Sequence, residues 1–143
     1  MSENCLFCKI VNHTHEADIL YEDEDLIIFN DIKPAAKFHI LVVPKNHLKD
    51  AKSLKPENKE LVVKMIEAGK RLVEEKDLDA TDTISGFHWP PFNSIQHLHL
   101  HFINSTSDMN FISRLIFKPN TWWFVTSDYT LDKLSLPEQN SHL

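Results

Sequence analysis

Three histidines occupy alternate positions in SIQHLHLHF, residues 94–102. Because successive side chains of a strand point to opposite faces, this alternation predicts a half-buried β-strand with His97, His99 and His101 on one face. The opposite face would carry the apolar residues of the same segment: Leu98, Leu100 and Phe102. Histidines two positions apart lie roughly 6–7 Å from each other on a strand, so two neighbours can reach one small group. The outer pair is about 13 Å apart, so the spacing indicates paired imidazole chemistry on a small substrate more than a three-histidine metal centre.

Cys5 and Cys8 form the pair CLFC near the N-terminus. Two cysteines at this spacing suit a shared metal ion or a dithiol redox pair better than a long-range structural disulfide. Three interpretations stay open: two free thiols, half of a zinc site that needs two further ligands, or a redox pair. The redox pair is the least favoured, because no βαβ pattern surrounds the motif.

The chain has 143 residues, of which 42% are hydrophobic, enough for one ordinary core but not for two. We therefore expect a single domain over residues 1–143. The formal charge of −6 disfavours binding to a nucleic-acid backbone, although a single nucleotide is compatible with it. The sequence has neither a continuous apolar stretch of about 20 residues nor a basic-then-apolar start, so no membrane association is expected. We expect a cytoplasmic protein, with the nucleus as a second location.

Neighbouring elements must position the histidine segment, and the sequence predicts four of them. Apolar runs at 25–32 and 38–47 predict two paired strands. Residues 81–89 predict a strand that leads into the turn HWPPFN and lies antiparallel to the histidine strand. Apolar residues recur at helical spacing through 56–76, so one long amphipathic helix is expected there.

The C-terminal part contains three patterned segments whose arrangement the sequence does not predict. They are an apolar stretch at 110–117, an aromatic block at 121–126 and a helix-like segment at 128–134. The polar end, residues 135–143, is typical of a flexible tail, which leaves a core over residues 5–134.

The pattern HLHLHFI, three alternate histidines followed by apolar residues, resembles the motif of the histidine triad (HIT) superfamily. The segments CLFCKI and DLIIFNDIKPAAKFHILVVPKNH and the long helix follow the order of its Hint branch. The turn GFHWPPFN and the aromatic segment NTWWFVTSDYTLDKL are similar to a subgroup that leans towards the aprataxin-like members. The resemblance implies an α+β HIT-like fold, with a five-stranded antiparallel sheet, one long helix and a C-terminal helical and aromatic segment.

The resemblance also implies a function. Hint proteins bind purine nucleoside monophosphates, are commonly homodimers and hydrolyse a bond at the α-phosphorus. A hydrolase of small AMP-linked substrates is therefore implied, acting on AMP phosphoramidates or aminoacyl adenylates and requiring no cofactor for catalysis. A homodimer or a higher homo-oligomer is implied as well.

The resemblance assigns roles to the triad and its surroundings. His99 would attack the α-phosphate and form a nucleotidyl-histidine that water cleaves, with His97 and His101 on either side. A neutral imidazole is a competent nucleophile only if one ring nitrogen is free while the other is held as a donor, as a backbone carbonyl can do. His101 would donate to the phosphate oxygens and stabilise developing charge. Ser94 matches a serine near the phosphate and the leaving group.

The nucleoside would be bound by residues that precede the long helix. Asp31 matches an acid that accepts hydrogen bonds from the ribose hydroxyls. His39 matches a histidine that supports the triad from a facing strand. The base would lie between apolar side chains that, by residue type alone, are equally typical of a core: Leu6, Ile10, Phe29 and Ile32.

The chain departs from the commonest Hint proteins in the turn before the triad. Those proteins have a glycine-rich turn that supplies backbone donors to phosphate, whereas this chain has GFHWPPFNS, and Gly86 replaces an asparagine. Asn93 or His88 is expected to replace the lost polar contact. The rigid Trp-Pro-Pro turn either braces the loop, which we favour, or shelters the reacting phosphate. The leaving group that the site accepts is therefore not predicted.

Superfamily members with a Cys-x-x-Cys start can bind zinc through two further histidines. In this chain the resemblance gives the ligand set Cys5, Cys8, His47 and His97. Two cysteines and two histidines close a tetrahedral site, so the metal would be structural. In the alternative, His97 forms a hydrogen bond into the core and the cysteines stay free.

Two other functions stay open beside a small-substrate hydrolase. An aprataxin-like hydrolase of adenylated nucleic-acid ends is weakened by the acidic charge balance. A nucleotide-binding or zinc-binding adaptor without turnover is also compatible with the sequence. A three-histidine metalloenzyme is disfavoured by the strand spacing.

Overall fold

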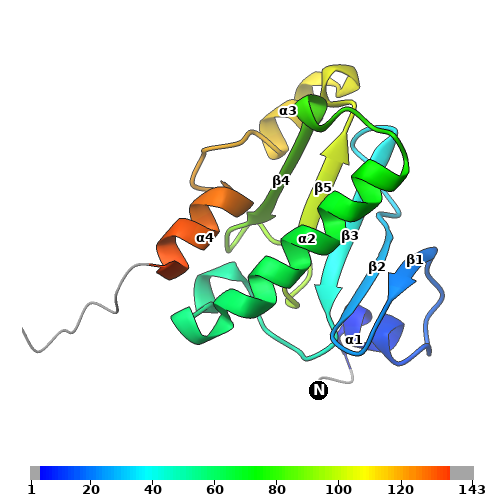
Figure 1. Cartoon of the computed structure of the whole chain (residues 1–143), viewed down its shortest axis with the longest axis vertical. Coiled ribbons are helices and arrows are strands. Elements are labelled where there is room, and N and C mark those ends of the chain that lie inside the picture. The colour runs from blue at the N-terminus through cyan, green and yellow to red at the C-terminus, as the bar shows by residue number, and fades with distance from the viewer. Residues whose placement is uncertain (1–3, 136–143) are drawn as a thin grey trace, which may run out of the picture.

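Residues 4–135 are described by a computed structural model, in which six antiparallel strands form one sheet (Figure 1). The strands lie in the order β1-β2-β3-β5-β4-β6. Their bounds are β1 Ile19–Glu22, β2 Leu26–Asn30, β3 Phe38–Pro44, β4 Thr83–His88, β5 Leu100–Asn104 and β6 Phe124–Thr126. The α-helices are α1 Leu6–Val11, α2 Lys59–Glu75, α3 Phe111–Ile116 and α4 Ser127–Ser135. No helix within 4–135 is long and apolar enough to cross a membrane.

The predicted pairing of strands is confirmed. β2 pairs antiparallel with β3, where Phe29 lies opposite Leu41. β4 pairs antiparallel with β5, where Gly86 lies opposite His101. Because β5 also pairs with β3, the histidine strand lies inside the sheet and not at its edge.

The strand predicted over 94–102 starts only at Leu100. Before that point, Leu98 donates its backbone N–H to the carbonyl of Leu48, in the loop after β3, at 2.7 Å. Leu98 is thus paired with this loop, whereas the ladder with β3 begins at Leu100. The first two histidines of the triad therefore precede β5, and the prediction of a strand is wrong for residues 94–99.

The sheet has six strands, so the expected number of five is wrong. The two edge strands, β1 and β6, have four and three residues, too few to show the alternation that predicts a strand. β6 comes from the aromatic block 121–126 and pairs with β4, where Val125 lies opposite Phe87. The C-terminal part of the chain thus covers the edge of β4.

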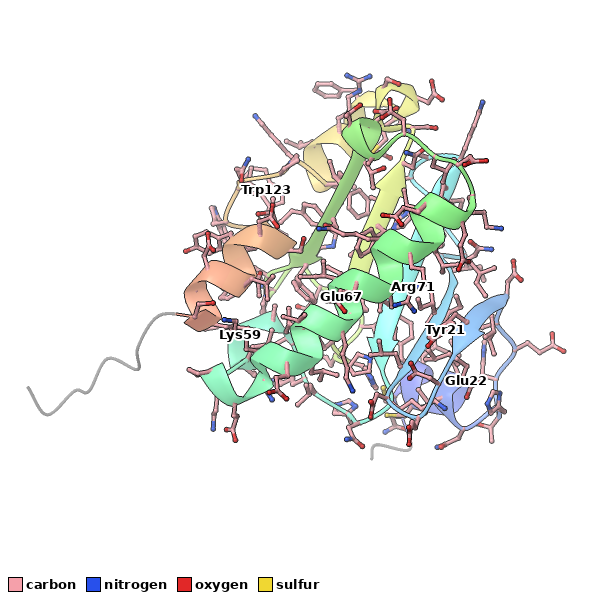
Figure 2. All side chains as sticks on the ribbon, in the orientation of Figure 1. Tyr21, Glu22, Lys59, Glu67, Arg71 and Trp123 are labelled. Carbon is pink, nitrogen blue, oxygen red and sulfur yellow. The ribbon has the colours of Figure 1, made fainter. Side chains whose placement is uncertain are left out.

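The helix predicted over 56–76 is confirmed as α2, which follows a 3-10 turn at Pro56–Asn58. Its outer side carries exposed charges such as Glu67 and Arg71 (Figure 2). Its buried side packs on one face of the sheet. The sheet residues of this core include Ile40, Val42, Leu100 and Phe102.

The three C-terminal segments take different structures. The helix-like segment 128–134 forms α4, which packs against α2. The apolar stretch 110–117 forms α3, which has no buried residue of its own. The predicted tail, residues 135–143, lies outside the described residues apart from Ser135 at the end of α4.

The opposite face of the sheet carries the imidazoles and a second apolar cluster. This cluster joins Phe7 and Ile10 of α1 to Phe29 and Leu41 of the sheet. The predicted division of the triad segment is confirmed, because its apolar side chains belong to the core under α2. The imidazoles therefore lie on the face away from the long helix, with Phe7 of α1 against the rings of His97 and His99.

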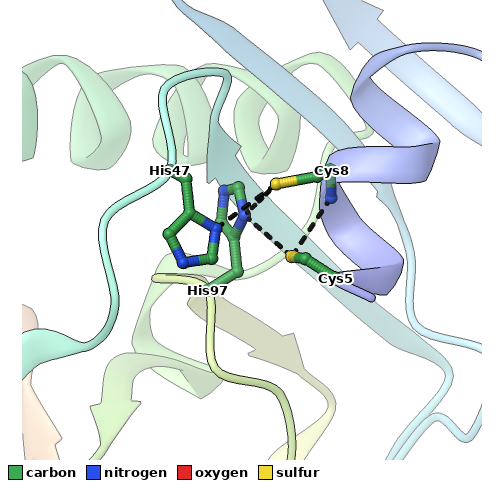
Figure 3. Close-up of side chains that lie close together, drawn as sticks. All are labelled: Cys5, Cys8, His47 and His97. Carbon is green, nitrogen blue, oxygen red and sulfur yellow. Dashed lines mark hydrogen bonds between the residues drawn. The ribbon is translucent and has the colours of Figure 1, made fainter. Parts of the chain in front are cut away.

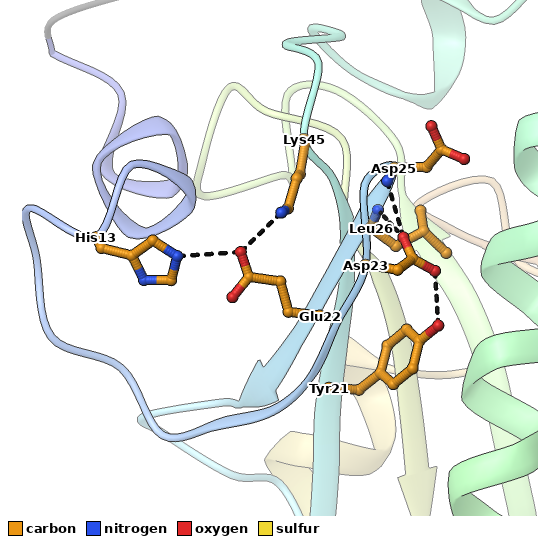
Figure 4. A network of polar contacts seen from close by, with 7 residues as sticks. All are labelled: His13, Tyr21, Glu22, Asp23, Asp25, Leu26 and Lys45. Carbon is orange, nitrogen blue, oxygen red and sulfur yellow. Dashed lines mark hydrogen bonds and ion pairs between the residues drawn. The ribbon is translucent and has the colours of Figure 1, made fainter.

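Polar contacts hold the turn between β1 and β2 (Figure 4). Asp23 accepts hydrogen bonds from the backbone N–H groups of Asp25 and Leu26, each at 2.8 Å. Glu22 forms an ion pair with Lys45 at 2.7 Å, which ties β1 to the residue after β3. The Asp23 contacts thus hold the turn, and the ion pair holds the start of the loop between β3 and α2.

Gly69 lies at a close approach between α2 and β5. A Cβ atom there would lie 2.1 Å from the ring of Phe102, which is buried. Overpacking costs about 1–3 kcal/mol or more, which outweighs the roughly 1 kcal/mol that alanine gains in helix propensity. Gly69→Ala is therefore expected to lower the free energy of unfolding, measured by urea denaturation.

The exposed neighbour Lys70 provides the control for this experiment. Lys70→Ala should change the free energy of unfolding by less than about 0.5 kcal/mol. Adding Phe102→Leu to Gly69→Ala should restore part of the loss, because a smaller side chain relieves the overlap. A Gly69→Ala protein as stable as the parent would contradict this packing.

Candidate active site and metal centre

The ring of His99 is held in a defined tautomer by its own backbone neighbour. Its Nδ1 lies 2.7 Å from the carbonyl oxygen of His97. A carbonyl only accepts, so Nδ1 donates and Nε2 keeps its lone pair. The side chain is buried, and this desolvation lowers its pKa from 6.5 to about 4. At neutral pH, His99 is therefore uncharged with a free Nε2, the form that a nucleophile needs.

The ring of His101 is oriented through His39 of the neighbouring strand β3. The backbone N–H of Ala35 donates to His39 Nδ1 at 3.0 Å, so the proton of a neutral His39 lies on Nε2. His39 Nε2 faces His101 Nδ1 at 2.9 Å, and Nδ1 must therefore be the acceptor. The proton of His101 is then on Nε2. This buried atom has no hydrogen-bond partner among residues 4–135, and it can serve as a donor to a bound group.

Asp31 adjoins this pair at the end of β2. One carboxylate oxygen, Oδ2, lies 3.3 Å from His39 Nε2. The other, Oδ1, accepts the backbone N–H of Lys33 at 2.9 Å. Burial lowers the pKa of His39 to about 4, although the Asp31 carboxylate acts in the opposite direction. Asp31, His39 and His101 thus form one connected group on the triad face.

Of the four apolar side chains expected around the base, only some are buried. Ile10 and Phe29 are buried in the cluster under α1, and Leu6 is half-buried beside them. Ile32 is 92% exposed, in the turn between β2 and β3. The prediction omitted Phe7, whose ring lies 5.4 Å from Phe29. The same ring meets His99 edge-on at 5.0 Å.

A signal for Phe7 was present in the sequence. Phe7 and Ile10 are three residues apart, so they share one face of a helix. α1 buries that face against the sheet.

The loop between β4 and β5 contributes Asn93 and Ser94. The side chain of Asn93 is buried, yet neither its oxygen nor its nitrogen has a hydrogen-bond partner among the described residues. Leaving a buried polar group unpaired costs about 1–3 kcal/mol, and such groups are concentrated at binding sites. Ser94 is exposed on the same loop.

Two further aromatic rings pack against His101. His88 precedes the triad in the sequence, and Phe117 follows it. The ring of His88, at the end of β4, lies 5.0 Å from that of His101. Phe117, directly after α3, lies 5.2 Å from it. No local pattern could have found Phe117, because its contact with the triad depends on how the C-terminal part folds back.

Four potential metal ligands lie close together: Cys5, Cys8, His47 and His97 (Figure 3). Cys5 Sγ lies 3.3 Å from His97 Nδ1, and Cys8 Sγ lies 3.3 Å from His47 Nδ1 and 3.5 Å from His97 Nδ1. A tetrahedral zinc ion with ordinary bond lengths separates a sulfur from a nitrogen ligand by about 3.5 Å. The ligand atoms all lie within 4.8 Å of one another. The arrangement therefore fits a tetrahedral metal ion.

A hydrogen bond outside this group orients His97. Its Nε2 donates to the carbonyl of Pro44 at 2.8 Å, which leaves the lone pair of Nδ1 facing the two sulfurs. His97 therefore points into the group of four ligands, whereas the rings of His99 and His101 contact each other at 5.0 Å. The triad is divided between a potential metal centre and a pair of imidazoles.

Comparisons with known proteins identify the family of this chain. The family model described as "Scavenger mRNA decapping enzyme C-term binding" matches residues 4–116. Adenosine 5'-monophosphoramidase HINT3 of Mus musculus is 46% identical over 134 residues, which cover 92% of this chain and 81% of the relative.

Solved structures share the fold. A HIT family hydrolase from Clostridium thermocellum has a TM-score of 0.71 at 28% identity, covering 78% of this chain and 99% of that one. A zinc-bound histidine triad family protein from Mycobacterium smegmatis has a TM-score of 0.62 and covers 92% of this chain and 94% of that one. At 23% identity, this second likeness shows the fold alone.

The buried imidazole of His39 should make the stability depend on pH. Its pKa is lowered from 6.5 to about 4 by burial. Between these values, the unfolded chain binds a proton that the folded chain does not, so stability falls as the pH falls. His39→Asn is therefore expected to flatten the decline in urea midpoint between pH 7 and pH 4.5.

A matched control removes an imidazole elsewhere. His15→Asn, at an exposed position, should keep the pH dependence of the parent. If His39→Asn showed the same decline as the parent, His39 would not be a buried neutral group.

Proposed function

The chain belongs to the histidine triad superfamily, and from that premise we propose that it hydrolyses small AMP-linked substrates, principally AMP phosphoramidates. The observation that carries the proposal is the ring of His99, which donates through Nδ1 to a backbone carbonyl and keeps a free Nε2 beside His101. The relative from Mus musculus, named an adenosine 5'-monophosphoramidase, supports the choice of reaction. Aminoacyl adenylates present the same α-phosphorus and are the second substrate class.

The reaction proceeds in two steps that balance. His99 Nε2 forms a bond to the α-phosphorus, the P–N bond breaks, and the leaving nitrogen keeps the bonding pair and takes up one proton. Water then bonds to the phosphorus of the nucleotidyl-histidine, the electron pair returns to Nε2, and one proton is released. The net change converts phosphoramidate and water into AMP and an amine.

His101 and Asn93 are the groups that stabilise the charge on the phosphate. His101 presents a buried N–H at Nε2, and the buried amide of Asn93 has a donor of its own. Donors fixed in advance in a site of low polarity stabilise a transition state without reorganisation. Asn93 thereby takes over the task of the glycine-rich turn that this chain lacks. Ser94, on the same loop, is placed beside the leaving group.

The nucleoside extends from the phosphate towards α1 and β2. Asp31 accepts the two ribose hydroxyls, which a carboxylate can do with one oxygen each. The base packs against the apolar cluster under α1, with Leu6, Ile10 and Phe29 on its inner side and exposed Ile32 at its edge. Because Asp31 also adjoins His39, ribose binding and the orientation of His101 share one carboxylate.

Cys5, Cys8, His47 and His97 are proposed to hold a structural zinc ion. The sulfur–nitrogen separations of 3.3–3.5 Å and the oriented ring of His97 support this proposal. A closed set of four protein ligands leaves no position for substrate, so the metal supplies only rigidity. These residues would thereby join α1 and the loop after β3 to the segment that precedes His99. The homodimer expected from the resemblance stays a prediction.

His99→Asn tests the proposed reaction. The variant is expected to lower kcat for AMP phosphoramidate by about 10³-fold or more, because it removes the attacking nitrogen. AMP binding, measured by calorimetry, should change little, because the ribose and base contacts stay. The control His13→Asn removes an exposed imidazole and should keep the parent kcat. Unchanged turnover by His99→Asn would contradict the proposed mechanism.

The zinc proposal is tested by elemental analysis of the purified protein. One zinc per chain is expected in the parent, and Cys8→Ser should lose it together with several degrees of melting temperature. Tyr129→Phe, an exposed change far from the four ligands, should keep the metal. Two reactive thiols, no zinc and a melting temperature insensitive to chelator would favour the free-cysteine alternative.

A further inference from the structure

A cavity of about 380 Å³ lies between β6, α4 and the residue that follows β4. Three aromatic side chains form much of its wall: Trp89, Trp122 and Tyr129. The wall also contains Val125 of β6 and Lys133 of α4, and Lys133 is its one charged residue. It contains none of the residues that form the candidate active site or the potential metal centre. The cavity is therefore a separate feature of the described chain.

This cavity lies on the side of the sheet opposite to the imidazoles. Phe124 of β6 lies on the imidazole side, because its ring is 6.0 Å from that of His101. Side chains alternate along a strand, so Val125 points to the other face, where it lines the cavity. Trp89 likewise packs against the core under α2. The sheet thus separates the cavity from His99, and binding there is independent of the proposed hydrolysis.

The aromatic wall is held in place although much of it is exposed. Trp122 is 62% exposed, and its ring centroid lies 5.1 Å from that of Phe92 and 6.3 Å from that of Trp123. The backbone N–H of Trp89 donates to the carbonyl of Trp123 at 3.0 Å, which joins two sides of the wall. Tyr129, on α4, is 56% exposed. Large exposed aromatic rings that gather around a hollow commonly mark a ligand site.

Lys133 gives the cavity a positive charge. It follows Tyr129 by four residues, so both side chains lie on the same side of α4. Its Nζ lies 5.0 Å from the centroid of the Trp89 ring. No carboxylate lies within ion-pair distance of this ammonium among residues 4–135. Because a cation already lies over the face of Trp89, a second cation would be repelled and an anion attracted.

We propose that the cavity is a ligand site for a small aromatic anion, one or two fused rings that carry a carboxylate or a phosphate. The ring packs against Trp89, Trp122 and Tyr129, where it gains from burial and from ring–ring contact. The anionic group pairs with Lys133. The cavity volume is near the lower end of the roughly 300–1,000 Å³ of ligand sites, so it suits one small molecule.

The test follows the indole N–H signals by NMR of ¹⁵N-labelled protein. All three tryptophans report on the cavity, because they lie in its wall or next to it: Trp89, Trp122 and Trp123. The probes are indole-3-acetate and AMP, each paired with a neutral counterpart, indole-3-acetamide or adenosine. At least one anion is expected to shift the signals of Trp89 and Trp122 and to bind more tightly than its counterpart.

The two anions distinguish the sources of charge. Shifts with indole-3-acetate assign an aromatic carboxylate, shifts with AMP assign a nucleotide, and shifts with both support the shared chemistry. Shifts with neither anion, or equal affinity for the anion and its neutral counterpart, would overturn the proposed site.

Exposed positions in the wall allow variants that keep the fold. Trp122→Ala should weaken binding of the anion at least about 5-fold, the lower end of the effect of losing one stacking ring. Lys133→Gln should weaken it about 2- to 5-fold, the range of an exposed ion pair, and remove the preference over the neutral counterpart.

Two exposed residues outside the wall are the matched controls. Phe111→Ala removes an aromatic ring that is 82% exposed, and Lys70→Gln removes an exposed ammonium. Both variants should keep the affinity of the parent. An unchanged affinity in Trp122→Ala, or an unchanged preference for the anion in Lys133→Gln, would contradict the assignment.

Discussion

The hydrogen bond from His99 Nδ1 to the carbonyl of His97 is the interaction on which the site depends. It exists because the two residues precede the β5 ladder, where the carbonyl of His97 is not committed to a neighbouring strand. Had the strand run through all three histidines, that carbonyl would point along the sheet towards a pairing partner. The late start of β5 is thus a requirement of the chemistry, because it gives His99 its tautomer.

Hydrogen bonds orient His97 and His101, the two neighbours of His99 in the triad, differently, so that the two rings have different roles. His97 is directed by the carbonyl of Pro44 towards the two sulfurs of the N-terminal pair. His101 is directed by His39 so that its Nε2 carries the proton. The short segment 97–101 therefore supplies a potential metal ligand, a lone pair and a donor at alternate positions, which explains the three imidazoles.

Much of this arrangement could be predicted from sequence because it follows local periodicity. The alternation in 97–102 predicted the side on which Leu98, Leu100 and Phe102 are buried, and the helical spacing in 56–76 predicted α2. Contacts between segments that are distant in the sequence could not be predicted from such patterns. The edge strand β6 is too short for a periodic signal, and the place of Phe117 depends on the fold of the C-terminal part. The tautomers of His99 and His101 depend on backbone positions that a residue pattern does not contain.

The account is tested most directly by trapping the covalent intermediate. The protein, in excess over AMP phosphoramidate, would be quenched with alkali within one turnover and mapped by peptide mass spectrometry. An AMP adduct on His99, appearing and decaying at rates that match product formation, is the predicted result. Full turnover with no adduct, or an adduct on another residue, would contradict attack by His99 and with it the central assignment.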